Sequence, residues 1–247
     1  MFKFNFNAED SPKSHSCENE YEVVKTEELS TPNTLITKSF TNLTIRDRSL
    51  KLVNEFPSIY NSDLIPGTYE GGFKLWECTI DLLEYLSNNS VFFNGKSVLD
   101  LGCGTGLLGI FTLVSGAQNV DFQDFNKDVL INTTMSNVLL NCEDKLNVCK
   151  YYSGDWKSFT DFNENKYDLI LTSETIYNVN NYKKLINLFE KKLKLSGCIL
   201  LIAKNYYFGV GGSISEFIHF LKSSKLNSDI VWESTDGVKK TLLNIHF

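Results

Sequence analysis

The stretch VLDLGCGTGLLG, residues 98–109, joins an apolar run to a set of closely spaced glycines. Gly102, Gly104 and Gly106 alternate directly after the run, and Gly109 follows three residues later. Glycines between a strand and a helix let the backbone pass close beneath a ligand that sits at the helix N-terminus. The spacing therefore predicts a loop that binds a nucleotide-like ligand.

Three ligand classes use glycine-rich loops of this kind. A nucleoside triphosphate loop needs a lysine after the glycines, and no lysine follows them here, so this class is excluded. The pattern Gly104-x-Gly106-x-x-Gly109 also fits the fingerprint of dinucleotide-binding proteins. A nicotinamide-dependent oxidoreductase therefore stays open as an alternative to a protein that binds S-adenosylmethionine.

Two acids near the glycines separate these alternatives. Asp124 lies 22 residues after Gly102 at the end of an expected strand, where its carboxylate can accept both ribose hydroxyls of either ligand. Asp100 lies two residues before Gly102, where a carboxylate could hold the α-amino group of a methionine moiety. Asp100 thus favours S-adenosylmethionine, bound over a loop that includes Gly102 and Gly104.

Two later stretches place further polar and aromatic residues after expected strands. In SGDW, residues 153–156, Asp155 could accept a hydrogen bond from the adenine amino group and Trp156 could pack on the adenine face. An ordinary buried aromatic residue is the simpler interpretation of Trp156 taken alone. In LTSETIYN, residues 171–178, polar side chains follow a strand at the point where doubly wound sheets place reacting groups.

The residues of LTSETIYN suggest distinct roles in a methyl transfer. Glu174 or Asn178 could orient an acceptor group, and the electron-rich face of Tyr177 or Trp76 could stabilise a sulfonium cation. Glu174 could instead be a charge near the N-terminus of the following helix, which is a common structural role. All four prolines lie at or before Pro66, so the Asn-Pro-Pro-Tyr motif of enzymes that methylate base amino groups or glutamine amides is absent.

Strand-like and helix-like segments alternate from about residue 71 onward, which predicts a doubly wound, mostly parallel α/β sheet. The two final strands, joined by a turn at Gly237, predict an antiparallel hairpin at one edge of the sheet. Asn126 is expected to cap a helix, and Gly197 is expected to end another. Strands are expected at 97–101, 120–123, 148–152, 168–172, 198–203, 229–234 and 240–247, and helices at about 75–86, from 107, after 126, at 182–193 and at 212–223.

Charge and composition limit the partners of the chain. The net charge is 24 − 30 = −6, and no block of basic residues indicates direct contact with nucleic acid. Residues 107–114 form the longest apolar run, which is too short to span a membrane. The six cysteines form no C-x-x-C pair and the three histidines are far apart, so no metal site is expected.

Five stretches together carry a resemblance to the eukaryotic histidine protein methyltransferases, which are seven-strand, S-adenosylmethionine-dependent enzymes. The glycine loop is common to all seven-strand methyltransferases, whereas the segment 64–79 and TSETIYN are more specific to this family. The likeness runs from about residue 60 to the C-terminus and is carried by SDLIPGTYEGGFKLWECTIDLLEYL, VLDLGCGTGLLG, FQDFN, LTSETIYN and YFGVGG.

The resemblance implies methyl transfer from S-adenosylmethionine to a histidine ring nitrogen of a large-subunit ribosomal protein, with residence in cytoplasm and nucleus. It also implies that the cofactor is bound by Leu75, Trp76, Glu77, Cys78, Thr79, Gly102, Gln123, Asp124, Phe125, Asp155, Trp156 and Ser173. Related protein-lysine methyltransferases carry Asp-x-x-Tyr after the fourth strand, where this chain has Glu174-x-x-Tyr177. A lysine methyltransferase of the same fold stays open as an alternative. A non-catalytic chaperone for a ribosomal protein is a further alternative, against which the unbroken glycine loop and the intact acids argue.

From this pattern we expect residues 1–45 to form a partly disordered or extended arm and residues 46–247 to form one methyltransferase domain of the class I, Rossmann-like type. We further expect a monomer that acts on a protein substrate.

Overall fold

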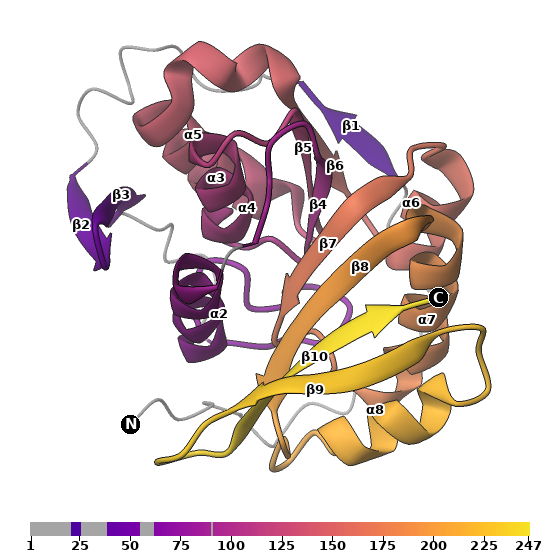
Figure 1. Cartoon of the computed structure of the whole chain (residues 1–247). Helices are drawn as coiled ribbons and strands as arrows, with labels where there is room; N and C mark the ends of the chain where they lie inside the picture. The colour runs from indigo at the N-terminus through magenta and orange to yellow at the C-terminus, as the bar shows by residue number, and fades with distance from the viewer. Residues whose placement is uncertain (1–20, 26–38, 55–61, 90) are drawn as a thin grey trace.

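The computed structural model describes residues 21–25, 39–54, 62–89 and 91–247. An eight-stranded sheet lies at the centre, in the strand order β1-β6-β5-β4-β7-β8-β10-β9 (Figure 1). The strands are β1 (Glu22–Val24), β4 (Ser97–Leu101), β5 (Asn119–Asp124), β6 (Cys149–Ser153), β7 (Tyr167–Ser173), β8 (Leu193–Lys204), β9 (Asn227–Glu233) and β10 (Lys240–His246).

The strand directions confirm the predicted fold class. β6, β5, β4, β7 and β8 pair in parallel, whereas β10 is antiparallel to both β8 and β9 and so makes the predicted C-terminal hairpin. β1 adds an eighth, antiparallel strand beside β6 that the sequence did not predict. All five parallel strands end at the same edge of the sheet, which is where ligands bind in doubly wound folds.

Helices cover both faces of the sheet (Figure 1). Each face buries one large apolar cluster, the first beneath α2, α3 and α5 and the second beneath α6, α7 and α8. The helices are α2 (Glu77–Asn88), α3 (Leu107–Val114), α4 (Lys127–Val129), the π-helix η2 (Leu130–Thr134), α5 (Met135–Cys142), the 3-10 helix η3 (Glu143–Val148), α6 (Trp156–Phe162), the 3-10 helix η4 (Val179–Asn181), α7 (Tyr182–Lys192) and α8 (Ile214–Leu221).

A separate hairpin, β2 (Phe40–Ile45) with β3 (Arg48–Val53), packs against α5. The Asn137 side chain accepts a hydrogen bond from the backbone amide of Val53 at 2.9 Å. The turn of this hairpin contains the predicted boundary between residues 45 and 46, so β2 of the predicted arm continues directly into the predicted domain. Residues 1–20 and 26–38 of that arm lie outside the described residues.

The predicted end of the helix after the fourth strand is wrong. α7 ends at Lys192, and Leu193 has extended backbone angles and pairs with Tyr167 as the first residue of β8. A Cβ atom on Gly197 would lie 2.9 Å from the Asp168 carbonyl oxygen. This glycine therefore allows close approach of β8 to β7 and does not cap the helix. Among the described residues, no helix is long and apolar enough to cross a membrane.

Candidate active site

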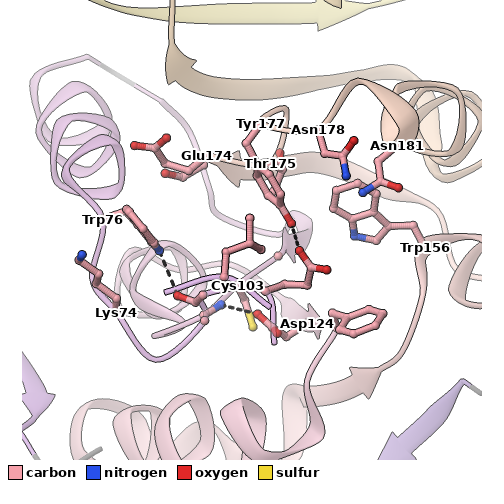
Figure 2. Close-up of a pocket in the computed structure, with 18 of the residues that line it drawn as sticks. Lys74, Trp76, Cys103, Asp124, Trp156, Glu174, Thr175, Tyr177, Asn178 and Asn181 are labelled. Atoms are coloured by element: carbon pink, nitrogen blue, oxygen red, sulfur yellow. Dashed lines mark hydrogen bonds between the residues drawn. The ribbon is translucent and has the colours of Figure 1, made fainter. Parts of the chain in front are cut away.

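A cleft of about 280 Å³ opens at the carboxyl ends of β4, β5 and β7 (Figure 2). The glycine loop after β4 lines it, as do the ends of β5 and β6, the segment after β7 and the loop 63–76 that precedes α2. The sequence predicted the strand-end residues of this cleft but none of the lining residues between 63 and 74.

The glycine loop requires glycine at each of its alternating positions. Gly102, Gly104 and Gly106 have φ angles of 63°, 49° and 73°, a left-handed backbone that other residues rarely adopt. A Cβ atom on Gly104 would lie 3.0 Å from the Gly72 carbonyl oxygen. The loop therefore passes close beneath the segment that forms the opposite wall. A Cβ on Gly109 would lie 2.3 Å from Phe122, so Gly109 serves helix–sheet packing.

Asp124 lies at the end of β5 and lines the cleft, and its predicted contact with the ribose hydroxyls stays a prediction. Its carboxylate accepts hydrogen bonds from the backbone amides of Gly104 at 2.9 Å and Asn126 at 3.0 Å. Burial raises the pKa of Asp124 to about 6, against the lowering effect of these amides, and the nearby charge of Glu70 raises it further. At neutral pH the group is an anionic acceptor close to its titration range.

Asn126 has a different role from the predicted helix cap. It precedes α4, but its side chain makes no capping hydrogen bond. Instead, its amide accepts from the backbone amide of Glu70 at 3.1 Å and donates to the carbonyl oxygen of Thr68 at 2.7 Å. Asn126 thereby fixes the loop before α2 against the end of β5.

Two side chains, one from η2 and one from α5, donate hydrogen bonds to the glycine loop. The Thr134 hydroxyl donates to the Gly104 carbonyl oxygen at 2.6 Å, and Asn137 donates to the Thr105 carbonyl oxygen at 2.8 Å. The same Asn137 holds Val53 of β3 through its side-chain oxygen. The β2–β3 hairpin is thus connected to the glycine loop through the Asn137 side chain.

Asp100 lies fully buried beneath the loop and is not among the residues that line the cleft. One carboxyl oxygen accepts from the Gly109 amide at 2.8 Å, and the other has no hydrogen-bond partner among the described residues. Burial raises the pKa of Asp100 to about 8. Its predicted contact with a methionine amino group stays a prediction, and its visible contact is with the first turn of α3.

The end of the cleft near β6 is aromatic and polar (Figure 2). Trp156 lines it and donates to the side chain of Gln123 at 3.0 Å, while Gln123 itself is fully buried and donates to the Gly154 carbonyl oxygen. Asp155 lines the cleft, caps α6 through the Lys157 amide at 2.7 Å and pairs with Lys184 at 2.7 Å. Phe125 also lines the cleft. Gln123 does not line it, so this side chain can affect a ligand only by holding Trp156 and Gly154 in place.

The segment at the start of α2 divides into two groups. Trp76 and Thr79 line the cleft, and Thr79 donates to the Ser173 hydroxyl at 3.1 Å, which brings Ser173 to the same wall. Leu75, Glu77 and Cys78 are not among the lining residues. Cys78 is fully buried, and burial together with the charge of Glu174 raises the pKa of its thiol well above the usual value.

Glu174 is held by neighbours on one side of the cleft. It has a left-handed backbone (φ 60°) and is buried, with Lys204 at 3.0 Å from one carboxyl oxygen and the Tyr207 hydroxyl donating to the other. Figure 2 shows its carboxylate directed away from Tyr177 and Asp124. The alternative interpretation as a charge at a helix N-terminus is wrong, because Asn181 holds the N-cap position of α7.

Tyr177 and Asn178, the other two predicted catalytic residues, both line the cleft. The Tyr177 hydroxyl donates to the Glu70 carboxylate, and burial raises the pKa of Tyr177 well above its usual value, with a further contribution from Glu70. Asn178 accepts from the Asn180 amide at 3.0 Å, and Figure 2 shows its side chain beside that of Asn181. Tyr177 therefore stays a neutral hydrogen-bond donor at physiological pH.

The charge of the cleft suits a cationic ligand. Five carboxylates line it, from Asp63, Glu70, Asp124, Asp155 and Glu174, against two lysines, Lys74 and Lys184. An excess of carboxylates together with aromatic faces favours a sulfonium-bearing molecule such as S-adenosylmethionine. Among the described residues, no group of three or more histidine, cysteine or acidic side chains could hold a metal ion.

Comparisons with known proteins show similarity to methyltransferases. A family model described as "Lysine methyltransferase" matches residues 67–223. "Histidine protein methyltransferase 1 homolog" from Dictyostelium discoideum is 49% identical over 179 residues, which cover 72% of this chain and 57% of that protein. The protein of the same description from Bos taurus is 42% identical, with 76% of this chain and 58% of that protein covered. This chain thus spans less than two thirds of the length of these relatives.

A solved structure described as "A putative sam-dependent methyltransferase from Streptococcus mutans" superimposes with a TM-score of 0.61 at 14% identity. The match covers 83% of this chain and 55% of that one, and it shows the fold alone. The predicted alternative of a nicotinamide-dependent oxidoreductase is wrong. The family model described as "Lysine methyltransferase" covers well over half of the chain, and the chain therefore belongs to that family of methyltransferases.

Proposed function

We propose that this chain is a protein-histidine N-methyltransferase, which transfers a methyl group from S-adenosylmethionine to a ring nitrogen of a histidine side chain. The observation that carries the proposal is the 49% identity to a protein described as a histidine protein methyltransferase homologue. The acidic, partly aromatic cleft at the strand ends supports it independently.

The residues of the cleft fit S-adenosylmethionine part by part. Asp124 is a buried acceptor for the ribose hydroxyls, Phe125 and Trp156 offer faces for the adenine ring, and the left-handed glycines leave room beside the backbone. When bound, the cofactor supplies an electrophilic methyl group on a sulfonium. The protein positions the acceptor and excludes water around it.

The acceptor chemistry favours histidine. A histidine ring has a pKa near 6.5, so at pH 7 most of it is neutral and carries a lone pair for attack. A lysine side chain with a pKa near 10.4 needs about 4.6 kcal/mol to lose its proton at the same pH. Methylation of a histidine therefore requires only that the cleft orient a neutral ring, whereas methylation of a lysine also requires the free energy to deprotonate an ammonium group.

A lysine acceptor is the second candidate, because the matching family model is described as a lysine methyltransferase. Glu174-x-x-Tyr177 stands where related lysine methyltransferases carry Asp-x-x-Tyr. In this chain Glu174 forms a buried ion pair with Lys204. Its carboxylate is therefore less able to accept a proton from a substrate lysine, which weakens the lysine alternative.

For the substrate, we propose a large-subunit ribosomal protein, and for the place of action the cytoplasm and nucleus, as the family resemblance implies. We further propose that the chain acts as a monomer. Light scattering of the purified protein and fluorescence imaging of the tagged chain would test the last two statements.

Mass spectrometry of ribosomal proteins tests the acceptor directly. Large subunits from cells that lack this chain would be incubated with the purified protein and S-adenosylmethionine. Methylhistidine in a ribosomal protein is the expected product, and methyllysine alone would refute the histidine assignment. Absence of any methylation, with intact binding of S-adenosylhomocysteine, would favour the non-catalytic chaperone.

A further inference from the structure

We propose that Glu70, bridged to Tyr177 across the cleft, is a catalytic residue that accepts the ring N–H of the acceptor histidine. The inference rests on the proposed histidine methylation and assigns a role within it to a loop residue that lies outside the predicted catalytic residues Glu174, Tyr177 and Asn178. Two features of the cleft support it: the hydrogen bonds that place Glu70, and the lysines and backbone amides that bind the other acids. The positive charge that develops on the acceptor ring during methyl transfer supports it as well.

Glu70 is rigidly placed although it lies in a loop. One of its carboxyl oxygens accepts from the backbone amide of Gly67 at 3.0 Å, and the other accepts from the Tyr177 hydroxyl. Its own backbone amide donates to the Asn126 side chain at 3.1 Å. Glu70 and Tyr177 both line the cleft, and Figure 2 shows Tyr177 between Trp76 and Trp156.

The Glu70 carboxylate keeps capacity for a ligand. A carboxylate offers about four lone-pair positions, two on each oxygen. The described part of the chain supplies one donor to each oxygen, from Gly67 and Tyr177. One acceptor position therefore stays available on each oxygen for a donor that enters the cleft.

The other acids that line the cleft already have lysine or backbone-amide partners. Asp63, Asp155 and Glu174 are each paired with a lysine, at 2.7, 2.7 and 3.0 Å. Asp124 is held by two backbone amides at the end of β5, where the ribose is expected. Of the acids that line the described cleft, Glu70 is the one that is neither paired with a lysine nor fixed at a strand end.

The chemistry of the acceptor calls for an acid at this place. The lone pair of one ring nitrogen forms a bond to the methyl carbon, and the carbon–sulfur bond breaks with its electron pair left on sulfur. Positive charge passes from sulfur to the ring, and the second ring nitrogen then releases its proton. A carboxylate that accepts this second N–H orients the neutral ring, stabilises the cationic product and can receive the proton.

Single-turnover kinetics at saturating S-adenosylmethionine would test Glu70→Gln on large ribosomal subunits from cells that lack this chain. We expect the rate constant for methylhistidine formation to fall at least tenfold at pH 7.5, because the amide keeps the shape but not the charge. The dissociation constant of S-adenosylhomocysteine, measured by calorimetry, should change less than threefold. A tenfold weaker binding with an unchanged rate constant would make Glu70 a cofactor ligand and overturn the proposal.

Two further variants complete the test. Tyr177→Phe should lower the rate constant three- to tenfold, and the double variant should lose little more than Glu70→Gln, because the two residues act as one unit. Glu143→Gln, an exposed residue of η3, is the matched control and should keep the rate within twofold. Full activity of Glu70→Gln would refute this inference alone, whereas methyllysine from the unaltered protein would refute the proposed function as well.

Discussion

The carboxylate of Asp124 accepts a hydrogen bond from the backbone amide of Gly104 at 2.9 Å, and this contact joins the two parts of the cofactor site that the sequence predicted separately. Asp124 stands at the end of β5 and Gly104 in the loop after β4. The bond fixes the orientation of the carboxylate before any ligand arrives. Burial of the acid raises its pKa to about 6, although the bond from Gly104 acts to lower it.

We expect the binding of S-adenosylhomocysteine to depend on the ionisation of Asp124. The ribose hydroxyls donate to the anionic carboxylate, so protonation below pH 6 removes an acceptor. The dissociation constant should rise about tenfold between pH 7 and pH 5. Asp124→Ala should weaken binding at pH 7 roughly tenfold to a hundredfold, because a hydrogen bond to a charged group contributes about 1.5–3 kcal/mol. Calorimetry over this pH range checks both, and an unchanged pH dependence in the variant would contradict the assignment.

Asp100 should make the folded chain less stable as the pH rises. Its pKa is raised from 3.8 to about 8 in the folded state, so between these values the unfolded chain has lost a proton that the folded chain keeps. Stability contributed by this group is therefore highest at acid pH and falls by about 1.4 kcal/mol per pH unit until the pH passes about 8. Asp100→Asn can still accept from Gly109 and should flatten the slope of unfolding free energy between pH 5 and 8. An identical slope in urea denaturation of both proteins would refute this.

The Glu174–Lys204 pair should contribute more to stability than to chemistry. Both side chains are buried, and removal of Lys204 takes away the cation that balances the buried Glu174 carboxylate, which keeps its hydrogen bond from the Tyr207 hydroxyl. Lys204→Ala should cost roughly 3–5 kcal/mol of unfolding free energy. Glu174→Gln should also lower the melting temperature while keeping methylhistidine formation at saturating cofactor within about fivefold. Loss of turnover in Glu174→Gln without a change in stability would instead show that Glu174 has the predicted role in orienting the acceptor.

The strand-end residues could be predicted because the fold itself places them. Asp124, Asp155 and Tyr177 follow parallel strands, and the carboxyl ends of these strands meet at one edge of the sheet whatever the loops do. The alternating glycines indicate a left-handed loop in the same way. These features depend on local pattern and sheet topology, which the sequence displays directly.

The partners of these residues could not be predicted, because they come from distant segments without a pattern of their own. Glu70 meets Tyr177 across 107 positions of sequence, and Asn126 meets Thr68 across 58. The partners of the Glu174 carboxylate are Lys204 at the end of β8 and Tyr207 in the loop that follows. Gly197 resembled a helix cap because nothing in the sequence showed how closely β8 approaches β7.

Asn126 should control the cleft through the loop that carries Glu70. Asn126→Ala removes the acceptor for the Glu70 amide and the donor to Thr68, so the loop loses its attachment to β5. We expect faster hydrogen exchange of the Gly67 and Glu70 amides and a three- to tenfold weaker binding of S-adenosylhomocysteine, because the loop that forms one wall of the cleft is no longer held against the end of β5.

Asn119→Ala is the matched control for that experiment. Its side chain donates to the Ser97 hydroxyl at 2.9 Å at the opposite end of the parallel strands, far from the cleft. This variant loses an asparagine hydrogen bond of comparable strength, so it should lower the melting temperature without changing cofactor binding. If Asn126→Ala changes neither the exchange of the loop amides nor the affinity, the loop is held by other contacts, and the coupling of Glu70 to the end of β5 is wrong.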